Sequence, residues 1–366
     1  MVIRFMYGFG TQSVLDVMTH RLHHVGKAPG NAADVARICQ LESTMKFMKL
    51  FAAPVLLAAA IFAVPSSAQT YPARAITLVV PYPPGGSADI LARTVGEQLA
   101  TRLGQPVIVE NKAGAGTAIG ARFVADAKPD GYTLLMGTVS SQAINPAMSK
   151  VGYDPIKGFA VVSALASIPF VLVAHPAAPY SNVSELIAAG RSSPGTIGFA
   201  SAGPGTSNHL AGEMLANAAH VQLLHVPYRG SAPALADVLA GHVPVMFDLQ
   251  TTAIPNLKAQ KVKALAVTSL RRSPLLPDVP TVAESGLPDF EVSAWFGLFA
   301  PAKVPQPVLR QLSEAMADVL QAPAMVQRLR EIGTEPDTRN AAQFASYTAA
   351  EVGKYALIVR SAGLAP

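Results

Sequence analysis

The sequence predicts an α/β protein whose two lobes enclose a hinged cleft. Short apolar segments alternate with segments in which apolar residues recur every three or four positions, a pattern typical of strands connected by helices. Half of the 366 residues are hydrophobic, which is enough for two cores of ordinary size. Strand-like segments end near residue 299, and only helical segments follow. The absence of predicted strands after residue 299 bears on how the chain connects the two lobes, as described below.

Eight short segments are predicted as strands. They are almost free of polar residues, and a strand that is apolar on both faces fits a parallel sheet with helices on either side. We therefore expect two doubly wound lobes. The segments cover residues 76–80, 107–109, 134–136, 171–174, 223–226, 245–247, 264–267 and 295–299.

Helices are predicted wherever apolar residues form a single stripe. Leu91, Val95, Leu99 and Leu103 repeat at every fourth position in the first helix. The other helical segments are 210–218, 235–239, 308–320, a segment from 323, and 342–360. The last three have no strand between them, so we expect them to return and cover the first lobe.

This return makes the first lobe discontinuous. The first lobe is predicted to comprise residues 69–167 and 294–366, and the second lobe residues 168–293. The two crossings, near Ser167 and near Ala294, would form the hinge of the cleft. Ligands of open α/β sheets lie beyond the carboxyl ends of the strands, so the cleft is the expected binding site.

Residues 45–68 have the pattern of a secretory signal peptide. Two lysines lead into fifteen uncharged residues at 50–64, and small side chains precede a cleavage point after Ala68. A membrane-spanning helix needs about 20 apolar residues, whereas this stretch is shorter and contains Pro54. We expect an exported protein.

Residues 1–44 precede this signal and show no pattern of a secondary-structure element. Because a signal peptide opens its chain, we hypothesise that translation starts at Met45 and that 1–44 is a mis-annotated upstream extension. The alternative is a disordered cytosolic extension. The mature chain would begin at Gln69.

The composition of the mature chain excludes several kinds of site. Its net charge is about +2 instead of +5, because six of the 28 basic and three of the 23 acidic residues precede Gln69. No basic run with interleaved aromatic residues points to nucleic acid. The one cysteine, Cys39, lies upstream of the signal, so no disulfide, thiol nucleophile or cysteine-based metal site is expected. We predict no cofactor, no metal and a monomer.

Loops of glycine, proline and hydroxyl residues follow several predicted strands. Residues 81–87 (PYPPGGS) and 201–207 (SAGPGTS) each open a helix. Free backbone N–H groups at such a helix start attract carboxylate or phosphate. One loop alone is as readily a tight turn, and Asp89 would itself satisfy part of the first helix dipole. Similar loops at 137–141 and 228–231 make four, which favours a cleft that binds a small polar anion.

Motifs for catalysis or metal binding are incomplete. Residues 114–120 are one residue too long for a dinucleotide-binding loop, and 199–203 lack the first glycine of a nucleophile elbow. His209 and Glu213 have the spacing of two metal ligands on a helix but no convincing third ligand, so pairing with each other is favoured. Asp248 ends an apolar strand and either faces the cleft or caps the residues that follow.

Five segments in order resemble the Bug family, the periplasmic solute receptors of tripartite tricarboxylate transporters. They are 80–89 (VPYPPGGSAD), 109–116 (VENKAGAG), 130–135 (DGYTLL), 201–213 and 226–230 (VPYRG). Each is moderately specific, and their order along the mature chain is a strong signal. Ala113 departs from the family pattern, where many relatives have proline, but touches no presumed ligand contact.

The resemblance implies a two-lobed, type II-like periplasmic binding protein that closes on its ligand. It implies a carboxylate held largely by backbone N–H groups and bridging water, delivery to membrane permease subunits, and no catalytic residue. The ligand-binding residues predicted from the resemblance and the loops are Pro83, Pro84, Gly85, Gly86, Ser87, Ala88, Thr138, Ser140, Ser141, Ser201, Ala202, Gly203, Gly205, Thr206, Ser207, Tyr228, Arg229 and Asp248.

Two other functions stay open. An exported hydrolase would use Ser201 or Ser207 with His209, and a ligand sensor would present its closed form to a histidine kinase. The ligand itself is not predicted, because a backbone cradle binds a carboxylate whatever is attached to it.

Overall fold

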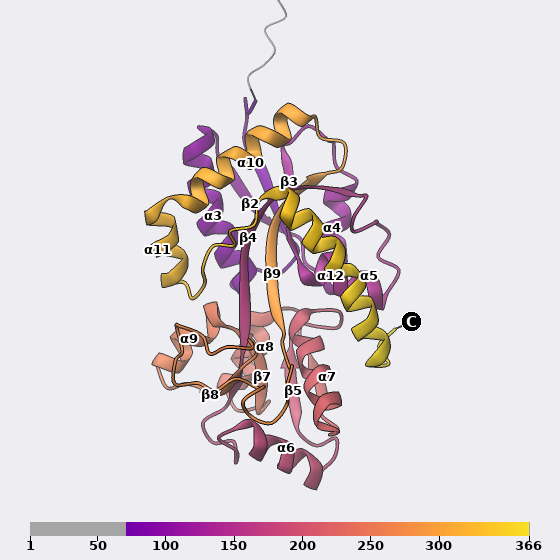
Figure 1. The fold of residues 1–366 in the computed structure, drawn as a ribbon, viewed down its shortest axis with the longest axis vertical. Helices are drawn as coiled ribbons and strands as arrows, with labels where there is room; N and C mark the ends of the chain where they lie inside the picture. The colour runs from indigo at the N-terminus through magenta and orange to yellow at the C-terminus, as the bar shows by residue number, and fades with distance from the viewer. Residues whose placement is uncertain (1–70, 366) are drawn as a thin grey trace, which may run out of the picture. The chain divides into compact units, whose positions relative to one another are not determined.

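The computed structural model describes residues 71–365, whose fold is shown in Figure 1. The predicted signal peptide at 45–68 and the segment 1–44 lie outside the described residues. Within the described range, no helix combines the length and apolarity needed to span a bilayer.

Within residues 71–365, nine strands form one continuous sheet. They are β1 (Ile76–Val80), β2 (Val107–Asn111), β3 (Thr133–Thr138), β4 (Phe159–Ala174), β5 (Gly198–Ser201), β6 (Leu224–Pro227), β7 (Val245–Leu249), β8 (Lys263–Val267) and β9 (Ser293–Pro301). Their order is β2-β1-β3-β9-β4-β7-β5-β6, with β8 paired to β4. Every predicted segment falls on a strand. The prediction missed β5, and it missed β4 before residue 171 because Ser163, Ser167 and Pro169 interrupt its apolar pattern.

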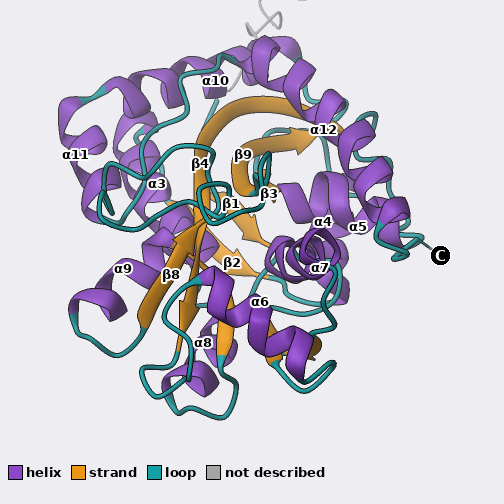
Figure 2. Ribbon diagram, turned by 60° about the horizontal axis from the view of Figure 1, so that its bottom comes forward, coloured by secondary structure: helices purple, strands orange, loops and turns teal. Residues whose placement is uncertain are grey.

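Helices cover both faces of this sheet, as Figure 2 shows. They are α3 (Ser87–Leu103), α4 (Ala118–Ala125), α5 (Asn145–Met148), α6 (Val183–Ser192), α7 (Ser207–Ala219), α8 (Ser231–Leu239), α9 (Gln250–Lys258), α10 (Gln306–Gln321), α11 (Pro323–Glu331) and α12 (Ala341–Ser361), with short helical turns η1 (Ala115–Thr117) and η2 (Ser140–Ile144). The stripe predicted for the first helix is buried at Leu91, Val95 and Leu99.

The sheet is mixed, whereas the sequence predicted parallel sheets. The groups β2-β1-β3 and β6-β5-β7 are parallel. However, β9 runs antiparallel to β3 and β4, and β4 runs antiparallel to β7 and β8. An apolar strand has the same composition in either direction, so its residues do not report its orientation. The antiparallel strands are those that join the two parallel groups.

Two strands, β4 and β9, carry the chain between these groups. The first part of β4 pairs with β9 from Phe159 to Pro169, and the rest pairs with β7 from Phe170 onward. In the β4–β9 ladder Ser167 lies opposite Trp295, one residue from Ala294. The two predicted crossings are therefore neighbours in space, and both strands curve strongly in Figure 2. This arrangement is the two-lobed α/β architecture that the sequence predicted.

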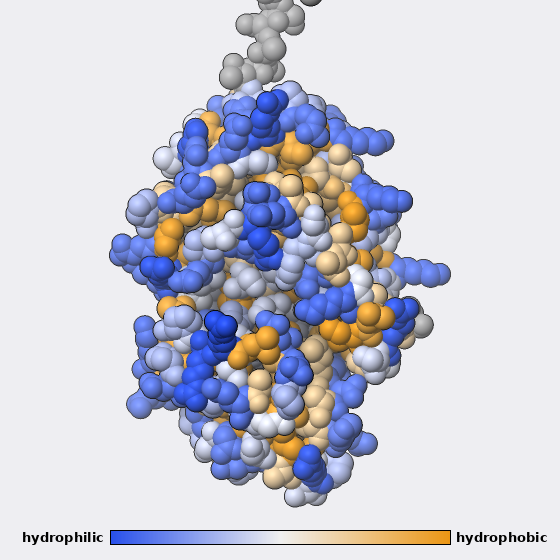
Figure 3. All heavy atoms as spheres, viewed as in Figure 1, coloured by the Kyte–Doolittle hydropathy of each residue, from blue (hydrophilic) through white to orange (hydrophobic). Residues whose placement is uncertain are grey.

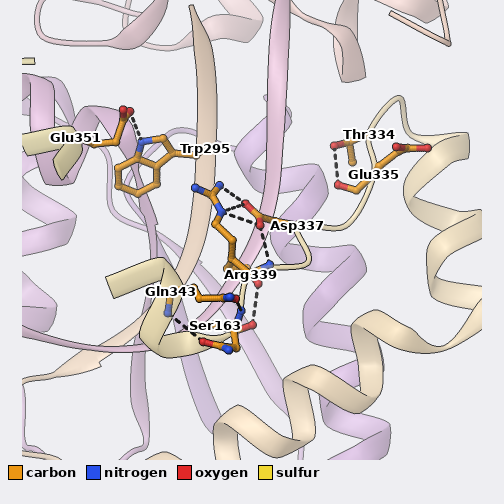
Figure 4. A network of polar contacts seen from close by, with 10 residues as sticks. Ser163, Trp295, Thr334, Glu335, Asp337, Arg339, Gln343 and Glu351 are labelled. Atoms are coloured by element: carbon orange, nitrogen blue, oxygen red, sulfur yellow. Dashed lines mark hydrogen bonds and ion pairs between the residues drawn. The ribbon is translucent and has the colours of Figure 1, made fainter. Parts of the chain in front are cut away.

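The helices after β9 return to the strands near the beginning of the described chain. Helix α10 contacts β4 and α3, and α12 contacts β4 and η2. Trp295 Nε1 on β9 donates a hydrogen bond to Glu351 of α12 at 3.0 Å (Figure 4). In the preceding loop the Asp337 carboxylate pairs with Arg339, and the Asp337 backbone N–H bonds the Leu165 carbonyl of β4 at 3.0 Å. The last helices are thus fastened to β4 and β9 by buried polar contacts.

The core follows the sheet through both groups of strands. Its largest fully buried side chains include Trp295, Phe170, Phe199, Phe247 and Phe299, which lie on β9, β4, β5 and β7. On the face shown in Figure 3, hydrophilic side chains are spread between small apolar areas. Burial of these large side chains fixes the strand ends from which the loops of the candidate site emerge.

Candidate functional site

Among the helices that follow strands, α3 begins beyond the carboxyl end of β1, α7 beyond that of β5 and α8 beyond that of β6. Their N-cap residues are Gly86, Thr206 and Gly230, and none of them caps its helix with a side chain. The first N–H groups of a helix have no partner within that helix, and they form the positive end of its dipole. The starts of α3 and α8 therefore present backbone donors of the kind that the sequence predicted for an anion site, whereas the first N–H of α7, that of Ser207, is bonded to Ser140 Oγ.

These helix starts meet at a small inner pocket of about 30 Å³. It is lined by Ser87 at the start of α3, Ser207 at the start of α7 and Ser231 at the start of α8, and it is closed by aromatic rings of the core. A volume of this size holds about one water molecule. No lysine, arginine or histidine lines the inner pocket. Backbone dipoles and hydroxyl groups are thus its main donors.

A larger outer cavity of about 750 Å³ adjoins the inner pocket. The two share Tyr82, Pro83, Ala202 and Thr206 in their walls. Glycine, proline and alanine make up most of the outer lining, and Arg229 is its one charged residue. Arg229 is exposed and forms no ion pair or hydrogen bond with another described residue. Cavities of about 300–1,000 Å³ are typical of small-molecule sites.

One wall of the outer cavity is a loop with an unusual backbone. Gly114, Ala115, Gly116 and Thr117 have φ angles of 129°, 45°, 59° and 90°. Non-glycine residues in this region cost about 1–3 kcal/mol and cluster at functional sites. Asn145 Nδ2 stabilises the loop by donating to the carbonyls of Ala115 and Gly116 at 2.6 and 3.0 Å. The segment connects β2 to α4, and in addition it lines a cavity.

Hydrogen bonds cross the cleft beside the inner pocket. The Ser207 backbone N–H donates to Ser140 Oγ at 3.0 Å. The Ser87 hydroxyl lies 3.3 Å from the Thr252 hydroxyl and also bonds Thr251. These contacts join η2 to α7 and α3 to α9, which explains why the inner pocket is narrow.

Asp248 supplies the inner pocket with its one carboxyl group. The residue is 2% exposed. Its Oδ1 accepts a hydrogen bond from Thr252 Oγ1 at 2.7 Å, and its buried Oδ2 has no partner. Burial raises the pKa of Asp248 to about 7. Both positions considered from the sequence are observed, since Asp248 lines the pocket and also bonds a residue that follows it.

Most of the predicted binding residues line one of the two cavities. Gly86, Ser87, Ala88, Thr138, Ser207 and Asp248 line the inner pocket; Gly203, Gly205, Tyr228 and Arg229 line the outer cavity; and Pro83, Ala202 and Thr206 line both. Pro84, Gly85, Ser140, Ser141 and Ser201 line neither. Pro84 and Gly85 are exposed in the turn, whereas the three serines are buried in hydrogen bonds.

Other lining residues were not predicted. Tyr82 lies inside a predicted loop and Asn208 directly follows another, and neither was selected, although both had the signal of a polar side chain next to a helix start. Ala113 lines the outer cavity, which differs from the expectation that it lies away from the site. Asn145, Phe170 and Phe296 come from distant parts of the chain, and nothing local in the sequence marks them.

The buried His209 and the half-buried His225 form a separate cluster. His225 Nε2 lies 2.6 Å from Ser201 Oγ, and the rings of His225 and His209 are 4.0 Å apart. Burial lowers the pKa of both to about 4. The contact of His209 with Glu213, at 3.6 Å, is therefore not an ion pair at neutral pH. In residues 71–365 no group of three or more His, Cys, Asp or Glu could hold a metal.

Comparisons with known proteins identify the family. The profile of the tripartite tricarboxylate transporter family receptor matches residues 91–364. A protein of Pseudomonas sp. strain P51, named "UPF0065 protein in tcbD-tcbE intergenic region", is 43% identical over 266 residues, covering 72% of this chain and 79% of the relative.

Solved structures agree with this assignment. The periplasmic binding protein BugD superposes with a TM-score of 0.77 at 37% identity, over 81% of this chain and 99% of BugD. R. palustris Rpa4515, solved with adipate, superposes with a TM-score of 0.78 at 34% identity, over 81% of this chain and 99% of its own. The chain accordingly belongs to the Bug family of tripartite tricarboxylate transporter receptors.

Proposed function

We propose that this protein is a periplasmic receptor that captures a small organic carboxylate and delivers it to the permease of a tripartite tricarboxylate transporter. The observation that carries the proposal is the meeting of three helix starts, none capped by the side chain of its N-cap residue, at one pocket that contains no basic side chain. A carboxylate is the ligand class that such donors favour. The adipate bound by the relative Rpa4515 supports the same class.

The two cavities suggest how a ligand is divided between them. The inner pocket is suited to one carboxylate, which replaces the single water that its volume allows. The outer cavity has room for the rest of the ligand, and its proline, tyrosine and glycine lining favours an extended, weakly polar body. Arg229 at this cavity is placed to meet a second acidic group.

The remaining sequence predictions complete the proposal. Residues 45–68 would direct export and be cleaved after Ala68. The lobe formed by 69–167 and 294–366 would open against 168–293 about the β4–β9 crossing, breaking the hydrogen bonds across the cleft. Opening of this kind admits a ligand, and closure gives a permease a distinct surface to recognise.

The geometry gives the hydrolase alternative no support. The hydroxyl of Ser201 is fully buried and bonds His225 instead of His209. Ser207 Oγ lies near Ser140 Oγ, and His209 Nδ1 has no hydrogen-bond partner. Neither proposed serine and histidine pair is assembled.

The test is a thermal-shift screen of the purified exported protein against mono-, di- and tricarboxylates, with the methyl ester of each acid as its neutral control. A ligand at about 100 times its dissociation constant adds roughly 2.7 kcal/mol of stability. At about 2–4 °C per kcal/mol, the melting temperature should rise by several degrees for the acid and not for its ester. Stabilisation by neutral sugars or cations alone would disprove an anion receptor.

A further inference from the structure

We propose that Asp248 binds the ligand as a neutral carboxylic acid, donating a hydrogen bond from Oδ2 to the ligand carboxylate, so that binding takes up a proton. The inference rests on the proposed function, because it concerns how the same pocket holds an anion. It makes Asp248 a specificity-determining residue that selects an acid over an amine.

The hydrogen bonds of Asp248 leave one oxygen available. Oδ1 is occupied by the hydroxyl of Thr252 at 2.7 Å, while Oδ2 is buried without a partner in a residue that lines the inner pocket. An ionised oxygen in this position would lack the paired charge that a buried carboxylate requires. A protonated oxygen instead offers a donor to whatever enters the pocket.

Burial favours the protonated form of Asp248 and outweighs the opposing hydrogen bonds from the Thr252 side chain and the Leu249 backbone. Tyr82 is the one other titratable side chain in the lining, and burial raises its pKa, so it stays neutral. Burial also raises the pKa of Asp248 to about 7. A ligand carboxylate entering the pocket would raise it further, because two adjacent carboxylates cannot both ionise without a cation.

An ionised Asp248 would have to pair with an ammonium group, and the pocket opposes that arrangement. The starts of α3, α7 and α8 face the same 30 Å³ and carry positive partial charge. An ammonium group there would be repelled by three helix dipoles, whereas a carboxylate is attracted by all three. The inner end of the ligand is therefore an acid without an amino group beside it.

Other titratable groups near β7 do not line the pocket. On α7, His209 has its pKa lowered to about 4 and Glu213 has its pKa raised by burial. On α8, Asp237 bonds Tyr228, and on α9, Lys258 is exposed. These groups also titrate, so their effect must be separated from that of Asp248. Comparing wild type with a variant changed only at Asp248 separates them.

The experiment is calorimetric titration of the exported protein with adipate, followed by other carboxylic acids, over a series of pH values. If only the protonated form binds, the apparent dissociation constant scales as the inverse of the protonated fraction. With a pKa of about 7, the affinity should fall roughly 90-fold between about pH 6 and pH 9. Above about pH 8 the titrations should also register uptake of nearly one proton when buffers of different ionisation enthalpy are compared.

The matched variants are Asp248→Asn and Asp126→Asn. The amide of Asp248→Asn keeps a donor and cannot titrate, so the acid should still bind with an affinity independent of pH and without proton uptake. Asp126 is an exposed carboxylate at the end of α4 that lines neither cavity, and its variant should keep the wild-type profile.

Three results would overturn the inference. An acid that binds wild type with a flat pH profile would show that Asp248 does not donate a proton. Tighter binding at high pH, lost in Asp248→Asn, would show an ionised partner for an ammonium group. Failure of every carboxylic acid to bind at about pH 6 would instead refute the proposed function, and this inference with it.

Discussion

Replacing Asp248 by asparagine should stabilise the unliganded protein, and more so as the pH rises. The folded pKa of about 7 exceeds the ordinary value of 3.8 because burial disfavours the ionised form. Below about pH 3.8 the carboxyl group is protonated in both states and does not change the free energy of unfolding. Between about pH 3.8 and pH 7 the unfolded chain has released the proton and the folded chain has not, so the group destabilises the fold increasingly as the pH rises. At about 1.4 kcal/mol per pKa unit, the cost reaches about 4 kcal/mol at alkaline pH as an upper estimate.

The measurement is urea unfolding of wild type and Asp248→Asn at about pH 5 and pH 8. The stability difference between the two proteins should grow by roughly 2–3 kcal/mol in favour of the variant over this range. Other groups titrate equally in both proteins, so they cancel in the difference. Parallel stability curves would show that Asp248 is ionised in the folded protein with its ordinary pKa, and would refute the reasoning from burial.

Three further predictions concern the site and its neighbours. In calorimetry, Gly86→Val should weaken ligand binding more than Ser87→Ala. The side chain added at residue 86 extends toward Ser231 across the inner pocket, whereas loss of one hydroxyl costs about 0.5–1.5 kcal/mol. Equal affinities of the two variants would show that this loop does not contact the ligand. Arg229→Lys should bind within roughly tenfold of wild type, about 1.4 kcal/mol, since backbone donors hold the inner carboxylate; a hundredfold loss would reveal a guanidinium clamp. As the pH falls below about 6, the wild-type protein should lose folding stability, because the pKa of His209 is about 4 in the folded protein and the unfolded ring binds a proton first. His209→Phe should reduce this loss. If the free energy of unfolding, measured with denaturant, fell as steeply with pH in the variant as in wild type, the prediction would be contradicted.

Much of the fold could be predicted because it depends on local patterns. Apolar runs located the strands, and stripes of spacing four located the longer helices, since burial imposes these periods directly on the sequence. Strand direction could not be predicted, because β4 and β9 have the composition of parallel strands and their orientation depends on how the chain returns between lobes. The same limit hid Asn145, Phe170 and Phe296, whose place in the cavities follows from packing between distant segments.

The loops show most clearly where sequence reasoning ends. Ser201 and Ser207 open and close one glycine-rich loop and carry the same hydroxyl group, yet they have different surroundings. Ser201 is the last residue of β5 and turns its hydroxyl to His225 in the core, while Ser207 is the first residue of α7 and lines the inner pocket. Likewise Gly85 is exposed in its turn, but Gly86 at the N-cap of α3 lines the pocket. In both loops the residues at the helix start, Gly86 and Ser207, are the ones that line the inner pocket. If either helix began one residue earlier or later, different side chains would line the pocket. The residue types in the loop do not determine at which residue the helix begins.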